Sequence, residues 1–138
     1  MWRYNALLSA QFAALTAVLA KIGLRGVDSN LATAVRTTVV LLLSWGIVCA
    51  AGSVHGLRTI GRTSWVFLLL SGLATGLSWL CYFKALSLGD VSRVAPVDKL
   101  SVVFVILFAL VVLREPATPR VLLGGALIAA GSFVLLLK

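Results

Sequence analysis

Several charged residues lie near the ends of long apolar stretches, where a charge needs a partner, water or the lipid headgroups. Lys84 precedes Gly89 by more than one helical turn, and a side chain at that helix end leans toward the bilayer centre. Asp98 and Lys99 follow Pro96 at the start of the next apolar stretch. Lys84 could therefore face an anionic or carbonyl-bearing solute, pair with Asp98, or simply stabilise the carbonyl end of its own helix.

The other charges near helix starts have simpler explanations. Arg36 and Lys99 lean back toward the headgroups, so both can snorkel. Asp98 can serve the positive end of its helix dipole. We interpret Arg36 and Pro96 as structural parts of helix ends, and keep Asp98 and Lys99 as candidates for the mouth of a polar pathway.

Hydroxyl side chains form stripes within three of the apolar stretches. In the third stretch they recur at spacings of four, three and four, which places them on one helix face. A hydroxyl in a membrane helix usually bonds its own backbone or a neighbouring helix, worth about 0.6 kcal/mol on average. Three stripes together nevertheless favour a shared aqueous or solute-facing seam. The candidate pathway residues are Thr16, Ser71, Thr75, Ser78, Tyr82, Lys84, Asp98 and Lys99.

Small residues at helical spacing indicate close helix packing. Gly72 and Gly76 form one such pair, and Gly125, Ala129 and Ser132 form another face. Small side chains let helix backbones approach closely. We therefore assign the last apolar stretch to packing or to contact with a second subunit.

The composition is that of an integral membrane protein. Of 138 residues, 61% are hydrophobic and 12% are charged, whereas a soluble domain has about a quarter charged residues. Crossing a bilayer takes about 20 mostly apolar residues per helix. The sequence predicts an all-α fold in one transmembrane domain, residues 1–138, with five spanning helices near 4–22, 31–52, 64–88, 93–113 and 120–137.

Capping residues support these boundaries. Asp28 can cap the second helix, and Thr118 followed by Pro119 is a typical start for the fifth. Gly89 is expected to end the third helix in the left-handed conformation.

An odd number of helices places the two termini on opposite sides of the membrane. Orientation follows an excess of Lys and Arg in cytoplasmic loops. The side of the N-terminus has five such residues and the other side has four, or seven if the cations within helix ends are counted. Because this balance gives little instruction, insertion in both orientations is a real possibility. The two sets are Arg3, Arg58, Arg62, Arg114 and Arg120 against Lys21, Arg25, Arg93 and Lys138, with Arg36, Lys84 and Lys99 within the helix ends.

The residues give no indication of catalysis, a metal or a cofactor. There is no paired acidic motif and no nucleophile with a base at helical spacing. Cys49 and Cys81 both lie in apolar stretches and indicate no disulfide framework. The net charge of +8 is explained by basic helix ends at anionic headgroups, so no nucleic-acid partner is expected.

A set of short motifs extends over most of the chain. They are Tyr82-Phe83-Lys84-Ala85-Leu86, Gly89-Asp90, Val94-Ala95-Pro96, Glu115-Pro116, Gly124 and Gly131. With these motifs the chain resembles the EamA domain of the drug/metabolite transporter superfamily. The resemblance implies inverted five-helix repeats that enclose a central cavity, and it implies that Glu115 caps or bridges helix ends. Related small multidrug resistance proteins have a proton-carrying glutamate in the first helix. Here Gln11 is the nearest polar candidate, so that coupling is not expected.

Family members usually carry two such units, whereas this chain has one, as single-domain members do. Two copies can form an inverted pair only if one inserts upside down, as the Lys/Arg balance allows. We therefore expect a secondary transporter protomer that moves a small metabolite by alternating access, as an inverted homodimer among the lipids of a bacterial-type inner membrane. The alternatives are an accessory half with a different partner subunit, and a non-transporting scaffold or lipid-binding protein.

Overall fold

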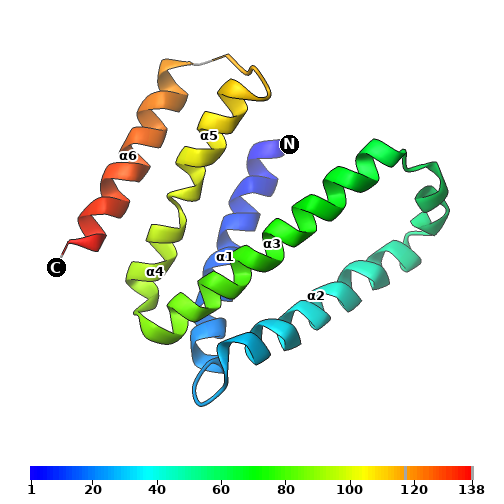
Figure 1. Ribbon diagram of the computed structural model, residues 1–138, viewed down its shortest axis with the longest axis horizontal. Coiled ribbons are helices and arrows are strands. Elements are labelled where there is room, and N and C mark those ends of the chain that lie inside the picture. Colours follow the sequence, from blue (N-terminus) through cyan, green and yellow to red (C-terminus); the bar gives the residue numbers. More distant parts are fainter. Residues whose placement is uncertain (117, 138) are drawn as a thin grey trace. The chain divides into compact units, whose positions relative to one another are not determined.

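The computed structural model describes residues 1–116 and 118–137, so Lys138, one of the cations counted above, lies outside the described residues. Within these ranges all regular structure is helical (Figure 1). The elements are α1 (Trp2–Gly23), α2 (Ser29–Ala50), the 3₁₀-helix η1 (Ser53–Thr59), α3 (Arg62–Leu88), α4 (Val91–Asp98), α5 (Ser101–Val111) and α6 (Pro119–Leu136).

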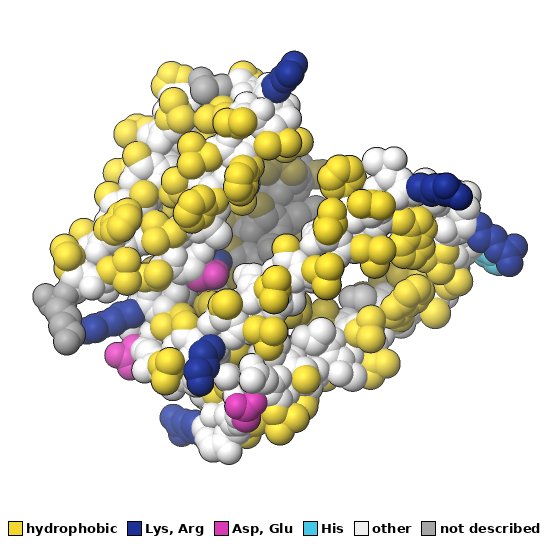
Figure 2. Space-filling view, in the orientation of Figure 1, with side chains coloured by type: hydrophobic (Ala, Val, Ile, Leu, Met, Phe, Trp, Pro, Cys, Tyr) yellow, Lys and Arg dark blue, Asp and Glu magenta, His cyan; other side chains and the backbone are white. Residues whose placement is uncertain are grey.

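Five helical segments in the described residues are long and apolar enough to cross a membrane, which confirms the predicted fold class. Helices α1, α2, α3 and α6 are one span each, and α4 with α5 forms the span Val91–Val111. Figure 2 shows hydrophobic side chains over much of the visible surface, with separate Lys and Arg side chains projecting from it. This distribution suits helices whose flanks face lipid and whose ends face headgroups.

The fourth span differs from the prediction, because it is interrupted where a continuous helix over 93–113 was expected. Pro96 has no amide hydrogen to donate. Just after it, the Lys99 amide donates to the Pro96 carbonyl at 3.0 Å and the Leu100 amide donates to the Val97 carbonyl at 3.0 Å. These bonds reach back three residues instead of four, so one tight 3₁₀-type turn separates α4 from α5.

Two of the three expected helix-terminal features are confirmed. The Asp28 carboxylate accepts hydrogen bonds from the amides of Asn30 at 2.9 Å and Leu31 at 3.1 Å. Thr118 caps α6 by accepting from the Val121 amide at 3.4 Å, with proline at the first helical position.

The expectation for Gly89 is wrong, because the glycines with left-handed backbone in the described residues are Gly26 and Gly52. After Gly89 the chain enters α4 directly through extended Asp90 (φ −73°, ψ 140°). The Lys21 ammonium also satisfies a carbonyl at the end of α3, that of Leu86. A left-handed cap is therefore not required there.

The chain forms two compact units, each described by itself. The first consists of residues 1–18 and 88–138, and in it α6 packs against both α4 and α5. The second consists of residues 19–87 and contains the end of α1, then α2, η1 and α3. That all of residues 1–138 act as one domain stays a prediction.

Candidate functional site

The second unit holds an arginine on two aromatic rings. Arg36 lies seven residues into α2, about 10 Å along the helix axis from its first residue. Its guanidinium carbon lies 4.2 Å from the ring centre of Trp79 and 5.4 Å from that of Phe83. The two rings are four residues apart, so they share one face of α3. We call these two rings the aromatic cradle.

The helix ends around the cradle are fixed by polar contacts. The Lys21 ammonium, near the end of α1, donates a hydrogen bond of 2.6 Å to the Leu86 carbonyl, which is one of the last four carbonyls of α3 and has no partner within its helix. Leu86 and Phe83 are buried, at 0% and 2% exposure. Phe83 therefore lies on the most buried turn of α3, whereas Trp79, one turn earlier, is half-buried.

The cradle stabilises the charge only in part. An arginine at the centre of a membrane helix costs roughly 2.5–3.5 kcal/mol on insertion scales, and Arg36 lies short of the centre of α2. A cation over an aromatic face recovers about 0.5–2 kcal/mol. Tyr82 also interacts electrostatically with Arg36, and water or an anion can supply a further partner.

The hydroxyl stripe of α3 lies on the outer surface of the second unit. Ser71, Thr75 and Ser78 are exposed, and the Thr75 hydroxyl donates to the Ser71 carbonyl at 2.8 Å. Tyr82 is half-buried and meets Phe83 edge-on, with ring centres 6.3 Å apart. At least one hydroxyl of the stripe is thus satisfied within its own helix.

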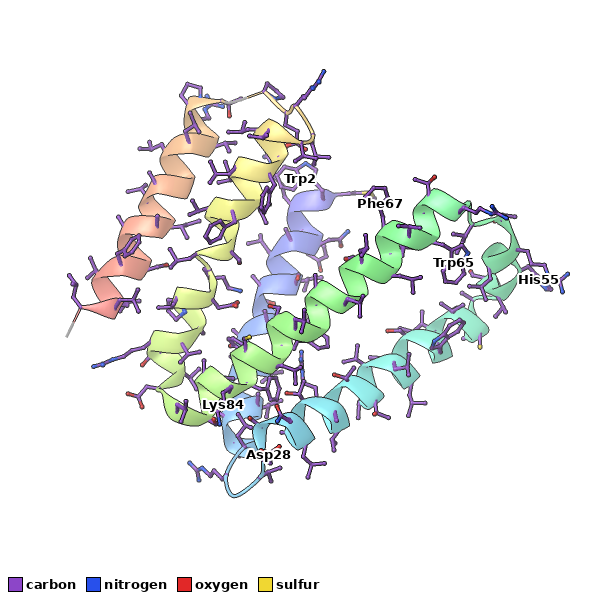
Figure 3. All side chains as sticks on the ribbon, viewed as in Figure 1. Trp2, Asp28, His55, Trp65, Phe67 and Lys84 are labelled. Carbon is purple, nitrogen blue, oxygen red and sulfur yellow. The ribbon has the colours of Figure 1, made fainter. Side chains whose placement is uncertain are left out.

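Lys84 is exposed near the carboxyl end of α3 (Figure 3). It is two residues from Tyr82, which turns its side chain by about 200° around the helix. Lys84 therefore leaves α3 on a different side from the stripe. Their joint role in a pathway stays a prediction.

The remaining predicted pathway residues belong to the first unit. Thr16 is half-buried in α1. Asp98 and Lys99 form an ion pair of 3.6 Å at the break between α4 and α5, with side chains 38% and 56% exposed. The break lies about 10–12 Å into the span that begins at Val91. A charged pair is thus held inside the fourth span.

Helix α6 supports this break. The Ser132 hydroxyl is buried and donates to the Pro96 carbonyl at 2.9 Å. A groove of about 390 Å³ runs beside this bond. It is lined by Pro96, Lys99, Val102, Leu127, Ile128, Gly131, Ser132 and Leu135.

The predicted packing positions differ in their surroundings. Gly125 is buried in α6, where an added Cβ would lie 2.7 Å from Ile106 Cδ1 of α5. Ala129 is half-buried on the same helix. At Gly72 and Gly76 a Cβ would meet no atom within 4 Å in the described structure.

Glu115 follows α5 and is exposed. Its amide donates to the Ala109 carbonyl at 3.1 Å, next to left-handed Arg114 (φ 53°). The contact of Glu115 to the end of α5 is therefore made by its backbone.

Arg36 is the residue that the sequence-based reasoning did not place in a site. Its extension to the headgroups stays a prediction. In the structure its guanidinium lies closer to Trp79 than to Phe83, and Trp79 is one turn further from the end of α3. The available signal was an aromatic pair at a spacing of four beside the hydroxyl stripe. Consecutive spanning helices are antiparallel, so the start of α2 and the end of α3 lie at the same side of the membrane. Arg36 and the aromatic pair could therefore be inferred to lie at a similar depth.

The profile of the EamA-like transporter family matches residues 1–137. The chain belongs to this family. The predicted resemblance is thereby confirmed, and with it an integral membrane protein of a small-molecule transporter family.

A relative supports the same assignment. This EamA-like chain is 52% identical over 134 residues to a Sinorhizobium sp. protein named "Uncharacterized transporter in cobO 3'region". The alignment covers 97% of this chain and 95% of that protein. No solved structure matches the chain.

Proposed function

We propose that this EamA-like chain is one protomer of a secondary transporter that moves a small metabolite across a bacterial cytoplasmic membrane by alternating access. The observation that carries the proposal is the interrupted fourth span, with Asp98 and Lys99 at its break. Discontinuous helices that hold charges within the bilayer are typical of substrate sites in secondary transporters. Family membership supports the same class of protein.

The proposed pathway residues divide between the units. Asp98, Lys99 and Thr16 belong to the first, whereas the α3 stripe and Lys84 belong to the second. The fifth span, α6, would support the break through Ser132 rather than line the path itself.

We further propose that the working form is an inverted homodimer. The described residues contain one five-helix set, whereas alternating access in such folds uses two inverted repeats around a shared site. The near balance of Lys and Arg between the two sides permits both orientations. Two copies of one chain would then supply both repeats.

Replacing Lys99 tests the role of the charged pair at the break in the fourth span. Lys99→Gln leaves Asp98 without its cation inside the span, and we expect solute uptake to fall about tenfold, the size of effect expected when one partner of a charged contact is lost. Lys99→Arg preserves the charge and should keep most of the uptake. The measurement is uptake by proteoliposomes of a panel of radiolabelled amino acids, carboxylic acids and sugar phosphates. Equal uptake by the Gln variant and the unsubstituted protein would contradict the proposal.

A further inference from the structure

We infer that the guanidinium of Arg36, held on the aromatic cradle of Trp79 and Phe83, binds the carboxylate or phosphate group of a small water-soluble solute. The inference deepens the proposed function, on which it rests for the identity of the ligand as a transported solute. It assigns the substrate class as anionic and gives Arg36 the recognising role.

Arg36 has no carboxylate counter-ion among the described residues. Among residues 19–87, all of which are described, Asp28 is the one carboxylate against six Lys and Arg residues. The Asp28 carboxylate already accepts two amide hydrogen bonds at the start of α2. No ion pair joins Arg36 to an acidic side chain in the described parts of the chain. Tyr82 interacts electrostatically with Arg36 but supplies no carboxylate, so an external anion can still neutralise the charge of Arg36.

The guanidinium of Arg36 has a geometry that suits a carboxylate or phosphate. Its contacts with Trp79 and Phe83 are made over the ring faces. A guanidinium has five N–H donors in a rigid planar fork, which matches a carboxylate or phosphate with two parallel hydrogen bonds. No hydrogen bond from the Arg36 side chain to another described residue occupies these donors. The cradle thus orients the fork and leaves its donors free.

The depth of the Arg36 guanidinium in the membrane favours a solute over a lipid headgroup as its ligand. Phe83 and Trp79 lie five and nine residues before the end of α3, which is about 7 and 13 Å along the helix axis. The guanidinium is nearer to the deeper ring. A snorkelling arginine would extend the other way, toward the headgroups. The position therefore favours an anion that enters from water.

Binding can be measured apart from transport. The protein has four tryptophans, and replacing Trp2, Trp45 and Trp65 with Phe leaves Trp79 as the reporter. Inorganic phosphate and succinate are titrated into this protein in maltoside detergent, at constant ionic strength set with chloride. We expect a saturable change in Trp79 emission with at least one of the two anions.

Three variants in the same background define the site. Arg36→Gln should bind about ten- to a hundredfold more weakly, as expected for loss of a charge-assisted contact. Arg36→Lys should retain part of the affinity, because it keeps the charge but loses the fork. Arg58→Gln, which changes an exposed arginine of the same unit, should bind like the parent. Circular dichroism and monodispersity identify any variant that fails to fold. If Arg36→Gln fails to fold, the affinity of Arg36→Lys relative to the parent decides whether Arg36 binds the anion.

The inference is overturned if neither anion changes the emission, or if Arg36→Gln and Arg36→Lys both respond like the parent. It is also overturned if added phospholipid removes the response to the soluble anions, since the site would then hold a headgroup. Failure of the proposed function has a different signature, namely anion binding in detergent with no uptake by proteoliposomes.

Discussion

A protein that carries Arg25→Gln with Arg93→Gln, or Arg58→Gln with Arg62→Gln, is expected to lose transport when it is expressed alone. The first pair removes one cation from the loop after α1 and one from α4, so the balance becomes five against two in favour of the N-terminal side, or five against five when the cations within helix ends are counted. The second pair leaves three against four, or three against seven by the wider count. Since the side richer in Lys and Arg stays in the cytoplasm, the two variants are biased toward opposite orientations.

Co-expression of the two variants should restore transport, because the oppositely biased copies can pair as an inverted dimer. Whole-cell uptake of the solute identified in proteoliposomes is the measurement, and each variant alone should fall to about a tenth or less of the parental rate if orientation follows the charge rule. All four arginines are exposed, so folding should be little affected. Replacing the same four with lysine is the matched control and should preserve transport. Full activity of either variant alone would contradict the inverted pair.

Gly125→Val is expected to lower the stability of the protein. A Cβ at this position would lie 2.7 Å from Ile106 Cδ1, the end of a flexible side chain on α5, so Ile106 would have to move and the methyl groups of valine would crowd the same contact. Inserting side-chain carbons into a packed contact typically costs about 1–3 kcal/mol. Thermal unfolding in maltoside detergent, followed by circular dichroism, should show a lower midpoint for this variant.

Gly131→Val is the matched control, because Gly131 lies on the same helix and has no atom within 4 Å of an added Cβ. Both substitutions change helix propensity equally, so the difference between their midpoints isolates the contact with Ile106. Equal midpoints would show that α5 and α6 do not pack closely at this glycine.

The sequence was sufficient for the parts of the fold that depend on local properties. Five spans follow from the lengths of the apolar stretches, and the cap of α2 follows from Asp28, whose carboxylate bonds amides two and three residues later. These features involve residues that are close together in the chain. No knowledge of packing is needed to predict them.

The break in the fourth span and the site on Arg36 depend on residues far apart in the chain. Pro96 can sit inside a helix with one missing donor. Its carbonyl accepts from the Lys99 amide and also from the hydroxyl of Ser132, thirty-six residues later. Arg36 meets Trp79 through the pairing of α2 with α3, whose register depends on how η1 joins them. Helical periodicity identifies a face on one helix but not the face that a neighbouring helix presents to it.

Labelling from one side of the membrane tests the inverted arrangement most directly. Cys49 and Cys81 are replaced with alanine, and His55→Cys places a single thiol in exposed η1 between α2 and α3. Intact spheroplasts are treated with a membrane-impermeant maleimide, and permeabilised ones with the same reagent. If Lys and Arg give no preferred orientation, about half of the protein should be labelled in intact spheroplasts and all of it after permeabilisation. Complete labelling or no labelling in the intact spheroplasts would contradict the account.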